Sequence, residues 1–248
     1  MAKSVMLSNG REFLSETAAL AHFKAILHAY KSGDEITDPS HHSDLSALLV
    51  RYDASITQDP PKIGSGINRF ERRQNKGPGY STPGFWVERT DGSWTDFSYI
   101  TGVKARPKPR SQEFSDACRH TVNGDIQAAK RRHFEQFANA DGKVLCDLTD
   151  QPITFDEAHL DHAYPTFGII VSMFRAARGW HDEIPDGVLS IAQDNQTTTT
   201  FIDPAIAESF REVHHRGAKM RMISAQKNLS MAPQQRVPVI KRPVQLPL

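Results

Sequence analysis

The residue pair Asp161-His162 is the part of the chain best suited to chemistry, and Pro165 follows it three residues later. A carboxylate is a hard ligand for a divalent cation, and a histidine can take a proton from water near neutral pH. Neighbouring side chains of a strand point to opposite faces. We therefore expect the strand to bend at this pair and aim both side chains into one pocket. The pair predicts half of a metal-dependent nuclease site.

The other half of the predicted site is Asn228, with His214 between the two halves along the chain. The order is a strand, a long connection, a second strand and a helix. Phosphodiester cleavage needs an activated water, charge relief at the phosphate and a stabilised leaving oxygen, and one divalent ion can do the last two. We expect Asp161 and Asn228 each to give one oxygen to that ion, while His162 activates the water.

The second half of the chain, residues 140–232, resembles the HNH endonuclease family, which has the ββα-metal fold. The matching residues are Cys146 through Thr154, Asp161-His162-x-x-Pro165, Phe210-x-x-Val213-His214-x-x-x-Ala218 and Arg221-x-Ile223-x-x-x-x-Asn228-Leu229. The resemblance implies that Asp161 and Asn228 are metal ligands and that His162 is the general base. It gives His214 the middle position, which orients the base strand or assists; His215 takes that place if the register shifts by one residue.

The cofactor that the resemblance implies is one divalent ion, usually Mg²⁺ or Mn²⁺, with nickel or zinc as alternatives. Cleavage in the family leaves a 5′-phosphate and a 3′-hydroxyl. Many HNH domains also carry two Cys-x-x-Cys pairs that bind a structural zinc. This chain has two cysteines, Cys118 and Cys146, so we expect no structural zinc and instead expect additional helical packing to stabilise the domain.

The first half of the chain, residues 7–103, resembles the DCL family, named for the plant protein "defective chloroplasts and leaves". The residues that carry the resemblance include Phe13, Phe23, Leu27, Asp44-Leu45, Leu48-Leu49, Gly64, Gly66-Ile67, Phe70, Phe85, Val87-x-Arg89-x-Asp91-Gly92-Ser93 and Asp96-Phe97-Ser98-Tyr99. Plant relatives are associated with the maturation of plastid ribosomal RNA. The resemblance implies a nucleic-acid setting and supplies no catalytic residue.

Basic residues that could contact phosphates lie in several segments. Residues 62–110 contain ten Lys and Arg against four Asp and Glu, although the net charge of the chain is +1. A basic face on a near-neutral protein can bind a phosphate backbone, and a solvated surface is the alternative. The predicted nucleic-acid-binding residues are Arg106, Lys108 and Arg110 in an extended linker, Lys130, Arg131 and Arg132 in a helix, and His159 and Arg221 beside the site. Arg221 could equally form a salt bridge, and His159 could lie on the other face of its strand.

The composition indicates a soluble protein that can bury a core, with 38% hydrophobic residues and a mean hydropathy of −0.50. No apolar run approaches the roughly 20 residues that cross a bilayer, and the N-terminus lacks the apolar segment of a signal peptide. With two cysteines a disulfide framework is not expected. We expect a cytoplasmic protein with no membrane partner.

Capping residues and apolar spacing predict an α+β fold. The expected helices start at Thr17, Ser43, Ser111, Thr166, Asp203 and Ser224, and Asn123-Gly124 could kink or split the one from Ser111 to Ala138. A hairpin is expected from residues 84–89 and 93–100 around Thr90-Asp91-Gly92, and a strand at 219–223. The proline-rich tail from Pro233 is expected to be extended or disordered.

Together, these features predict a two-domain α+β protein. Residues 1–110 form a DCL-like recognition domain that ends in a basic linker, 111–139 a connecting helical region, 140–232 the nuclease domain and 233–248 the tail. The expected function is that of a bacterial or phage restriction-type endonuclease acting on double-stranded DNA rather than RNA. A homodimer or a nicking monomer is allowed. The alternative is a non-catalytic nucleic-acid-binding or RNA-processing factor with a degenerate ββα fold.

Overall fold

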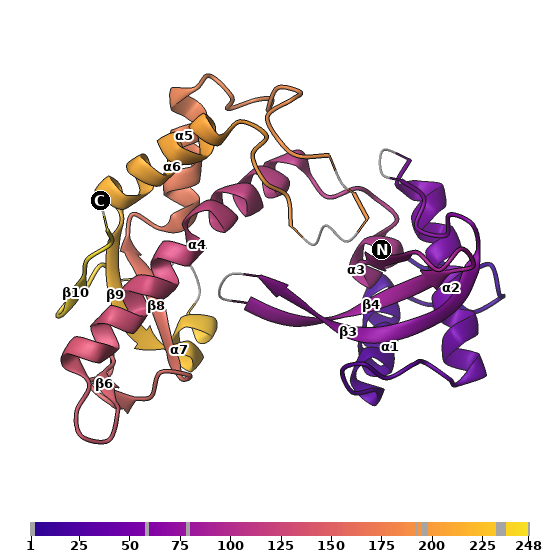
Figure 1. The fold of residues 1–248 in the computed structure, drawn as a ribbon, viewed down its shortest axis with the longest axis horizontal. Coiled ribbons are helices and arrows are strands. Elements are labelled where there is room, and N and C mark those ends of the chain that lie inside the picture. The colour runs from indigo at the N-terminus through magenta and orange to yellow at the C-terminus, as the bar shows by residue number, and fades with distance from the viewer. Residues whose placement is uncertain are drawn as a thin grey trace. The chain divides into compact units, whose positions relative to one another are not determined.

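The computed structural model describes residues 3–57, 60–77, 80–191, 193–194, 198–231 and 237–247. The chain divides into two compact units. The first unit consists of residues 1–112 and 191–199, and the second of residues 113–190 and 200–248. Both helices and small antiparallel sheets are present (Figure 1), which confirms the expected α+β class.

The first unit is a three-stranded antiparallel sheet with helices against one face. Its elements are β1 (Val5–Met6), β2 (Glu12–Phe13), α1 (Glu16–Ala29), α2 (Pro39–Ser55), β3 (Ile67–Gly77), β4 (Tyr80–Arg89), β5 (Trp94–Phe97) and α3 (Tyr99–Lys104). The sheet order is β3-β4-β5. Phe70, Phe85 and Phe97 of the sheet pack with Phe23 of α1 and Leu48 of α2 in one apolar core.

The predicted hairpin in this unit is confirmed by the pairing of β4 with β5, in which Val87 lies opposite Thr95. Gly92 in the turn has a φ of 81°, a conformation that glycine adopts without a steric penalty. Three boundaries differ from expectation. Helix α1 begins at Glu16, because Ser15 rather than Thr17 caps it. Helix α2 begins before Ser43, because Asp38 caps it ahead of Pro39. Tyr99 begins α3 instead of extending the strand, because Ser98 caps that helix.

Residue Asp194 belongs to the first unit although it follows a long stretch of the second. Its carboxylate accepts hydrogen bonds from both terminal nitrogens of Arg89, with Nη1 to Oδ2 at 2.6 Å and Nη2 to Oδ1 at 3.0 Å. Arg89 also donates to the carbonyls of Lys62 and Pro61. These contacts anchor residues 193–194 to the end of β4.

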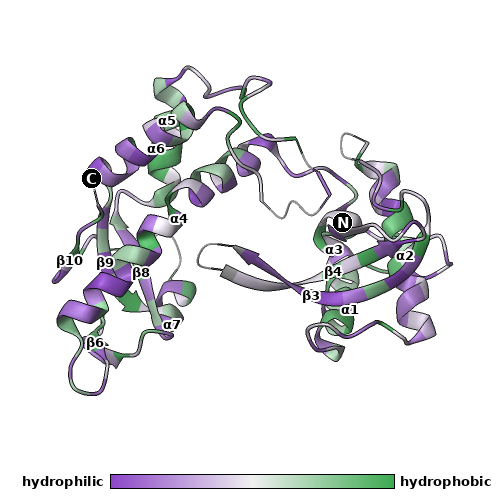
Figure 2. Cartoon of the chain, viewed as in Figure 1, coloured by the Kyte–Doolittle hydropathy of each residue, from purple (hydrophilic) through white to green (hydrophobic). Residues whose placement is uncertain are grey.

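The second unit contains a long helix, three shorter helices and two small sheets. Its elements are α4 (Arg110–Phe137), β6 (Val144–Leu145), β7 (Pro152–Ile153), β8 (Ala158–Tyr164), α5 (Phe167–Ala177), α6 (Pro204–Gly217), β9 (Lys219–Ser224), α7 (Ala225–Ser230) and β10 (Pro243–Val244). The larger sheet has the order β10-β9-β8 and is antiparallel. Helix α4, whose first three residues are assigned to the first unit, carries hydrophobic and hydrophilic segments along its length (Figure 2).

Helix α4 is continuous through Asn123-Gly124, so the split that these residues allowed does not occur. Buried Val122 and Ile126 on either side hold this part of the helix in the core of the unit. The starts of the other helices are confirmed. Thr166 accepts from the amide of Ile169, and Asp203 and Ser224 cap α6 and α7 in the same way.

The tail contains a strand that its proline-rich composition did not predict. Pro243–Val244 forms β10, in which Val244 lies opposite Met220 of β9. Arg242 donates to the buried carboxylate of Asp147, with Nη1 to Oδ1 at 3.0 Å. The composition of the tail indicated neither contact, because both partners lie far away in the sequence. Among the described residues, no helix is long and apolar enough to span a bilayer.

Candidate functional site

The candidate site is built on two antiparallel strands followed directly by a helix. Strand β8 pairs with β9, with Asp161 opposite Arg221 and His162 opposite Met220. Strand β9 ends at Ser224, whose side chain caps α7. The connection between the strands holds α5 and α6. This is the expected order of strand, connection, strand and helix.

The carboxylate of Asp161 forms a buried ion pair with Arg221. The Nε and Nη2 atoms of Arg221 lie 3.1 and 2.9 Å from Oδ2 of Asp161, and its Nη1 donates to the carbonyls of Val237 and Val239, each at 2.7 Å. Asp161 is 4% exposed and Arg221 is 0% exposed. Of the two roles considered for Arg221, the structure shows the salt bridge and not an exposed phosphate contact.

Asn228 reaches the strand through His159. The amide nitrogen of Asn228 lies 3.1 Å from Nδ1 of His159. Burial and the charge of Lys130 lower the pKa of His159, while Asp161 opposes this shift. A neutral ring can therefore accept the hydrogen bond at Nδ1. Since His159 and Asp161 are two residues apart on one strand, they share a face of β8, and α7 places Asn228 against that face.

The imidazole of His162 contacts His214 of α6, with the two Nε2 atoms 2.8 Å apart. Both rings are buried, and Phe167 packs against both. Burial, with smaller contributions from the charges of His215 and Arg119, lowers the pKa of His214 to about 3. His214 is therefore neutral near pH 7. The contact places the ring of His214 directly against that of His162.

The bend expected at Asp161-His162 occurs one residue later. The β8–β9 register shifts between His162 and Tyr164. Asp161 is paired with Arg221 of β9, whereas His162 is paired with His214 of α6. The two neighbouring side chains therefore have different partners, as strand alternation requires, and the expectation that both point into one pocket is wrong.

The basic residues predicted to bind nucleic acid differ in exposure. Lys130 is 8% exposed, donates from Nζ to the carbonyl of Ala158 at 2.7 Å and lies over the Phe155 ring. This burial corrects the expectation that Lys130 faces a phosphate, because Lys130 lies on the side of α4 that contacts β8. Arg131 and Arg132 on the same helix are exposed.

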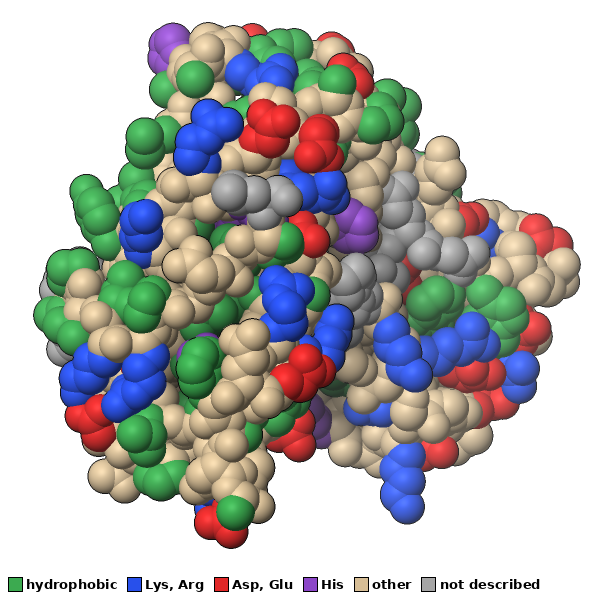
Figure 3. Space-filling model, turned by 60° about the vertical axis from the view of Figure 1, so that its left-hand side comes forward, with side chains coloured by type: hydrophobic (Ala, Val, Ile, Leu, Met, Phe, Trp, Pro, Cys, Tyr) green, Lys and Arg blue, Asp and Glu red, His purple; other side chains and the backbone are tan. Residues whose placement is uncertain are grey.

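The linker residues Arg106, Lys108 and Arg110 are also exposed, and Arg110 is the first residue of α4. On the face drawn in Figure 3, Lys and Arg side chains are interspersed with Asp and Glu rather than gathered in one basic stripe. Charges of both signs on this face match the near-neutral net charge of the chain.

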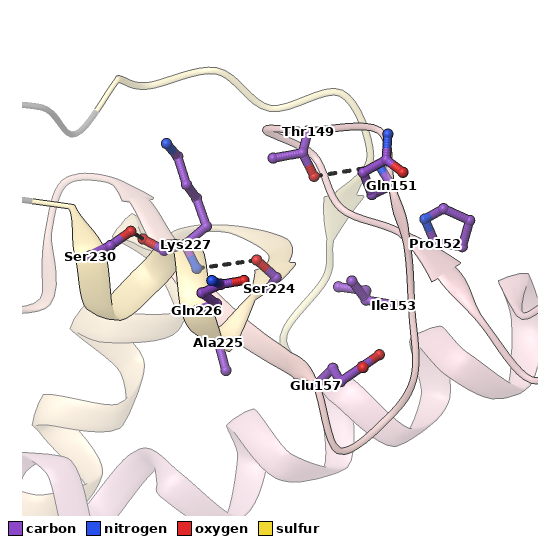
Figure 4. A pocket seen from close by; sticks show the side chains of 10 residues that line it. All are labelled: Thr149, Gln151, Pro152, Ile153, Glu157, Ser224, Ala225, Gln226, Lys227 and Ser230. Atoms are coloured by element: carbon purple, nitrogen blue, oxygen red, sulfur yellow. Dashed lines mark hydrogen bonds between the residues drawn. The ribbon is translucent and has the colours of Figure 1, made fainter.

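A hollow of about 630 Å³ lies beside α7, and the sequence analysis assigned no role to its lining. It is bounded by the segment that contains the β6–β7 hairpin and by α7, with Thr149, Glu157, Ser224 and Lys227 as polar lining residues (Figure 4). Ser224 accepts a hydrogen bond from the backbone of Lys227 there. The residue after Lys227 is Asn228, so the hollow adjoins the helix of the candidate site.

Two of the side chains on the shared face of β8 and α7 are ligand types for a hard divalent cation. Asp161 has carboxylate oxygens and Asn228 an amide oxygen, which Mg²⁺ or Mn²⁺ accepts together with water, whereas the imidazole of His159 suits Zn²⁺ or Ni²⁺ better. The positive charge of Arg221 on Asp161 opposes cation binding. Within the described ranges, no three or more His, Cys, Asp and Glu side chains are grouped to hold a metal. A site in which one carboxylate and one amide bind the ion and water supplies the other ligands does not require three such side chains.

Comparison with known proteins gives two similarities. Residues 24–103 match a family described as a protein of unknown function, DUF3223. The solution structure of an uncharacterized protein from Rhodospirillum rubrum is 31% identical, and the match covers 41% of this chain and 89% of that one, with a TM-score of 0.33. No curated protein matches the chain.

Proposed function

We propose that this chain is a metal-dependent endonuclease that hydrolyses phosphodiester bonds of DNA. The chain belongs to the same family as the uncharacterized Rhodospirillum rubrum protein. The observation that carries the proposal is the contact between Asn228 of α7 and His159 of β8. It brings the helix of a strand-strand-helix unit against the strand face that carries Asp161, with His162 next in sequence. The finer assignments follow from the resemblances: an HNH nuclease domain joined to a DCL-like recognition domain, with a restriction-type role.

The side chains have separate tasks in this proposal. Asp161 and Asn228 would hold one Mg²⁺ or Mn²⁺ ion, which when bound supplies charge relief at the phosphate and at the leaving oxygen. His162 takes the proton of the attacking water, as a neutral imidazole can near pH 7. His214, neutral and buried, orients the ring of His162 through their 2.8 Å contact. Exposed Arg131 and Arg132 lie on α4 and contribute phosphate contacts.

The ion pair between Asp161 and Arg221 favours a second candidate, a nucleic-acid-binding protein that does not cut. A carboxylate that is already neutralised by a buried guanidinium is a weaker metal ligand. In this alternative the same strand-strand-helix unit is retained for its fold, and the chain binds DNA or RNA without a cation. The two functions differ in whether a divalent ion changes the nucleic acid.

The test is a plasmid-nicking assay with the purified full chain in Mg²⁺, Mn²⁺ or EDTA, with structured RNA as a second substrate. We expect metal-dependent cutting of DNA that leaves a 5′-phosphate, and at least a 100-fold loss of rate, an order-of-magnitude estimate, for His162→Ala and Asn228→Ala. Gln226→Ala is the matched control, because Gln226 is exposed on the same helix as Asn228. Circular dichroism establishes that each variant is folded.

Three results would separate the candidates. If His162→Ala still cuts DNA, His162 is not the general base. Binding of DNA without cutting in any metal supports the non-catalytic alternative. Cutting confined to RNA replaces the DNA substrate by RNA and leaves the site assignment in place.

A further inference from the structure

A chain of three histidines leads from the predicted base to a carboxylate on another helix. His162 Nε2 lies 2.8 Å from His214 Nε2, and His214 Nδ1 lies 3.1 Å from His215 Nδ1. His215 Nε2 then lies 3.2 Å from Oδ2 of Asp125 in an ion-pair contact. The chain therefore runs from β8 through two residues of α6 to α4, and all of these elements belong to the second unit.

The rings of this chain are held in an apolar environment. His214 is 0% exposed, and the side chain of His215 is 3% exposed. Phe167 contacts the rings of His162 and His214, and Phe210 contacts His214 from the same helix. Burial lowers the pKa of His214 and of His215, although Asp125 opposes the shift at His215. A neutral imidazole carries one proton, and the contacts of each ring select which nitrogen holds it.

Each nitrogen-to-nitrogen contact accommodates one proton, so the tautomers of the three rings are linked. The negative charge of the Asp125 carboxylate, 3.2 Å from Nε2 of His215, favours a proton on that nitrogen. Nδ1 of His215 is then an acceptor, and His214 must carry its proton on Nδ1. Nε2 of His214 becomes an acceptor in turn, and His162 must carry its proton on Nε2. The opposite set of tautomers would direct a lone pair of His215 at the carboxylate, which is repulsive.

We propose that Asp125 is a positioning residue that acts through His215 and His214 to fix the tautomer of His162, with the proton on Nε2 and the lone pair on Nδ1. The role of that lone pair in taking a proton from water rests on the proposed nuclease function. The tautomer itself does not rest on it, because it is argued from the contacts among the three rings and Asp125. Arg211 holds the carboxylate in place, with its Nε 3.1 Å from the same oxygen of Asp125.

Nuclear magnetic resonance of the full chain, labelled with ¹⁵N in its histidine rings, measures the tautomer directly. Long-range ¹⁵N–¹H spectra at pH 7.5 distinguish protonated from unprotonated Nδ1, and the His162→Gln variant assigns the His162 signals. In the wild type we expect an unprotonated Nδ1. In Asp125→Ala we expect a measurable fraction of His162 with a protonated Nδ1, because the carboxylate beside His215 is lost.

Two further variants and a control sharpen this experiment. Asp125→Asn keeps a side-chain oxygen beside His215 and should keep the wild-type tautomer. His215→Phe removes the ring nitrogens that link Asp125 to His214 but keeps an aromatic ring. It should give the same mixture of His162 tautomers as Asp125→Ala, and it serves as the test if Asp125→Ala folds poorly. Glu135→Ala is the control, because Glu135 is an exposed acid on the same helix. A wild-type spectrum with protonated Nδ1, or an unchanged spectrum in both disrupting variants, overturns the proposal.

Nuclease kinetics provide the second readout. We expect Asp125→Ala to lower kcat by about 10–100-fold, as loss of an orienting partner commonly does, with little change in KM and with recovery in Asp125→Asn. A chain with no nuclease activity under any condition refutes the proposed function and leaves the spectroscopic result to decide the tautomer. Conversely, full activity of Asp125→Ala together with a changed spectrum shows that the tautomer is not needed for cutting and refutes the positioning role.

Discussion

Replacing Arg221 with methionine is the most direct test of how the site is held together. Arg221 and Asp161 are both buried, and two nitrogens of the guanidinium contact one oxygen of the carboxylate. Methionine keeps much of the length and apolar contact of the side chain but removes the charge. The buried carboxylate of Asp161 then loses the two charged hydrogen bonds that Arg221 donates. Breaking a buried pair in this way costs about 3–5 kcal/mol.

The other contacts of Arg221 add little to this figure. Its Nη1 donates to the carbonyls of Val237 and Val239, but both of these residues are exposed, so water can replace the lost donor. In the double variant Arg221→Met/Asp161→Asn no charge remains unpaired. We therefore expect the double variant to recover about 2 kcal/mol or more of the loss.

Hydrogen exchange of the backbone amides of β8 and β9 is the appropriate assay, because the chain has two units and a whole-chain transition is not two-state. Lys219→Met is the control, since Lys219 is exposed on the same strand and its replacement should change stability by less than about 0.5 kcal/mol. A loss below about 1 kcal/mol for Arg221→Met, or strictly additive effects in the double variant, would refute the claim that this buried pair is a principal contributor to the sheet.

Three other outcomes follow from the structure. The pKa of His214 is lowered to about 3, so the unfolded chain binds an extra proton between that value and about 6.5. The stability of the second unit should fall with decreasing pH in this window by up to about 1.4 kcal/mol per unit, and hydrogen exchange of the α6 amides should show a weaker pH dependence of stability in His214→Gln. Burial raises the pKa of the Cys118 thiol, whereas hydrogen bonds from Thr149 and from backbone groups outweigh burial and lower the pKa of Cys146. Iodoacetamide at pH 8 should therefore label Cys146 faster than Cys118. Equal labelling rates by mass spectrometry would contradict this. Lys130→Met should leave DNA affinity nearly unchanged, whereas Arg131→Ala should weaken it mainly at low salt; fluorescence anisotropy at two salt concentrations distinguishes the two effects.

Local signals in the sequence predicted the caps of α5, α6 and α7 correctly but missed those of α1 and α2, and they predicted distant pairings poorly. Thr166, Asp203 and Ser224 cap helices because a side-chain oxygen meets an amide two or three residues away, so the evidence lies within one turn. Strand β3 was not predicted, since its sequence Asn-Arg-Phe-Glu-Arg-Arg-Gln-Asn is mostly polar. It forms because β4 pairs with it along nearly its whole length.

In the candidate site, too, the order of the elements was predictable from the sequence, whereas contacts between distant residues were not. The order of Asp161, His214 and Asn228 along the chain predicted a strand-strand-helix unit, and these elements are present. The sequence did not decide that Asp161 pairs with Arg221, because that contact depends on the register of two strands 60 residues apart. Nor did it point to Asp125, since no spacing rule relates an acid on α4 to a histidine on α6.

The excursion of residues 191–199 into the first unit means that the polypeptide passes between the units three times. Cutting the gene after codon 110 would therefore not yield two independent halves. The N-terminal fragment would lose Asp194 and leave the guanidinium of Arg89 without its carboxylate, and the C-terminal fragment would keep a segment whose anchor had been removed. A deletion intended to test target recognition should therefore substitute surface residues within an intact chain, because a truncation would confuse lost binding with lost folding.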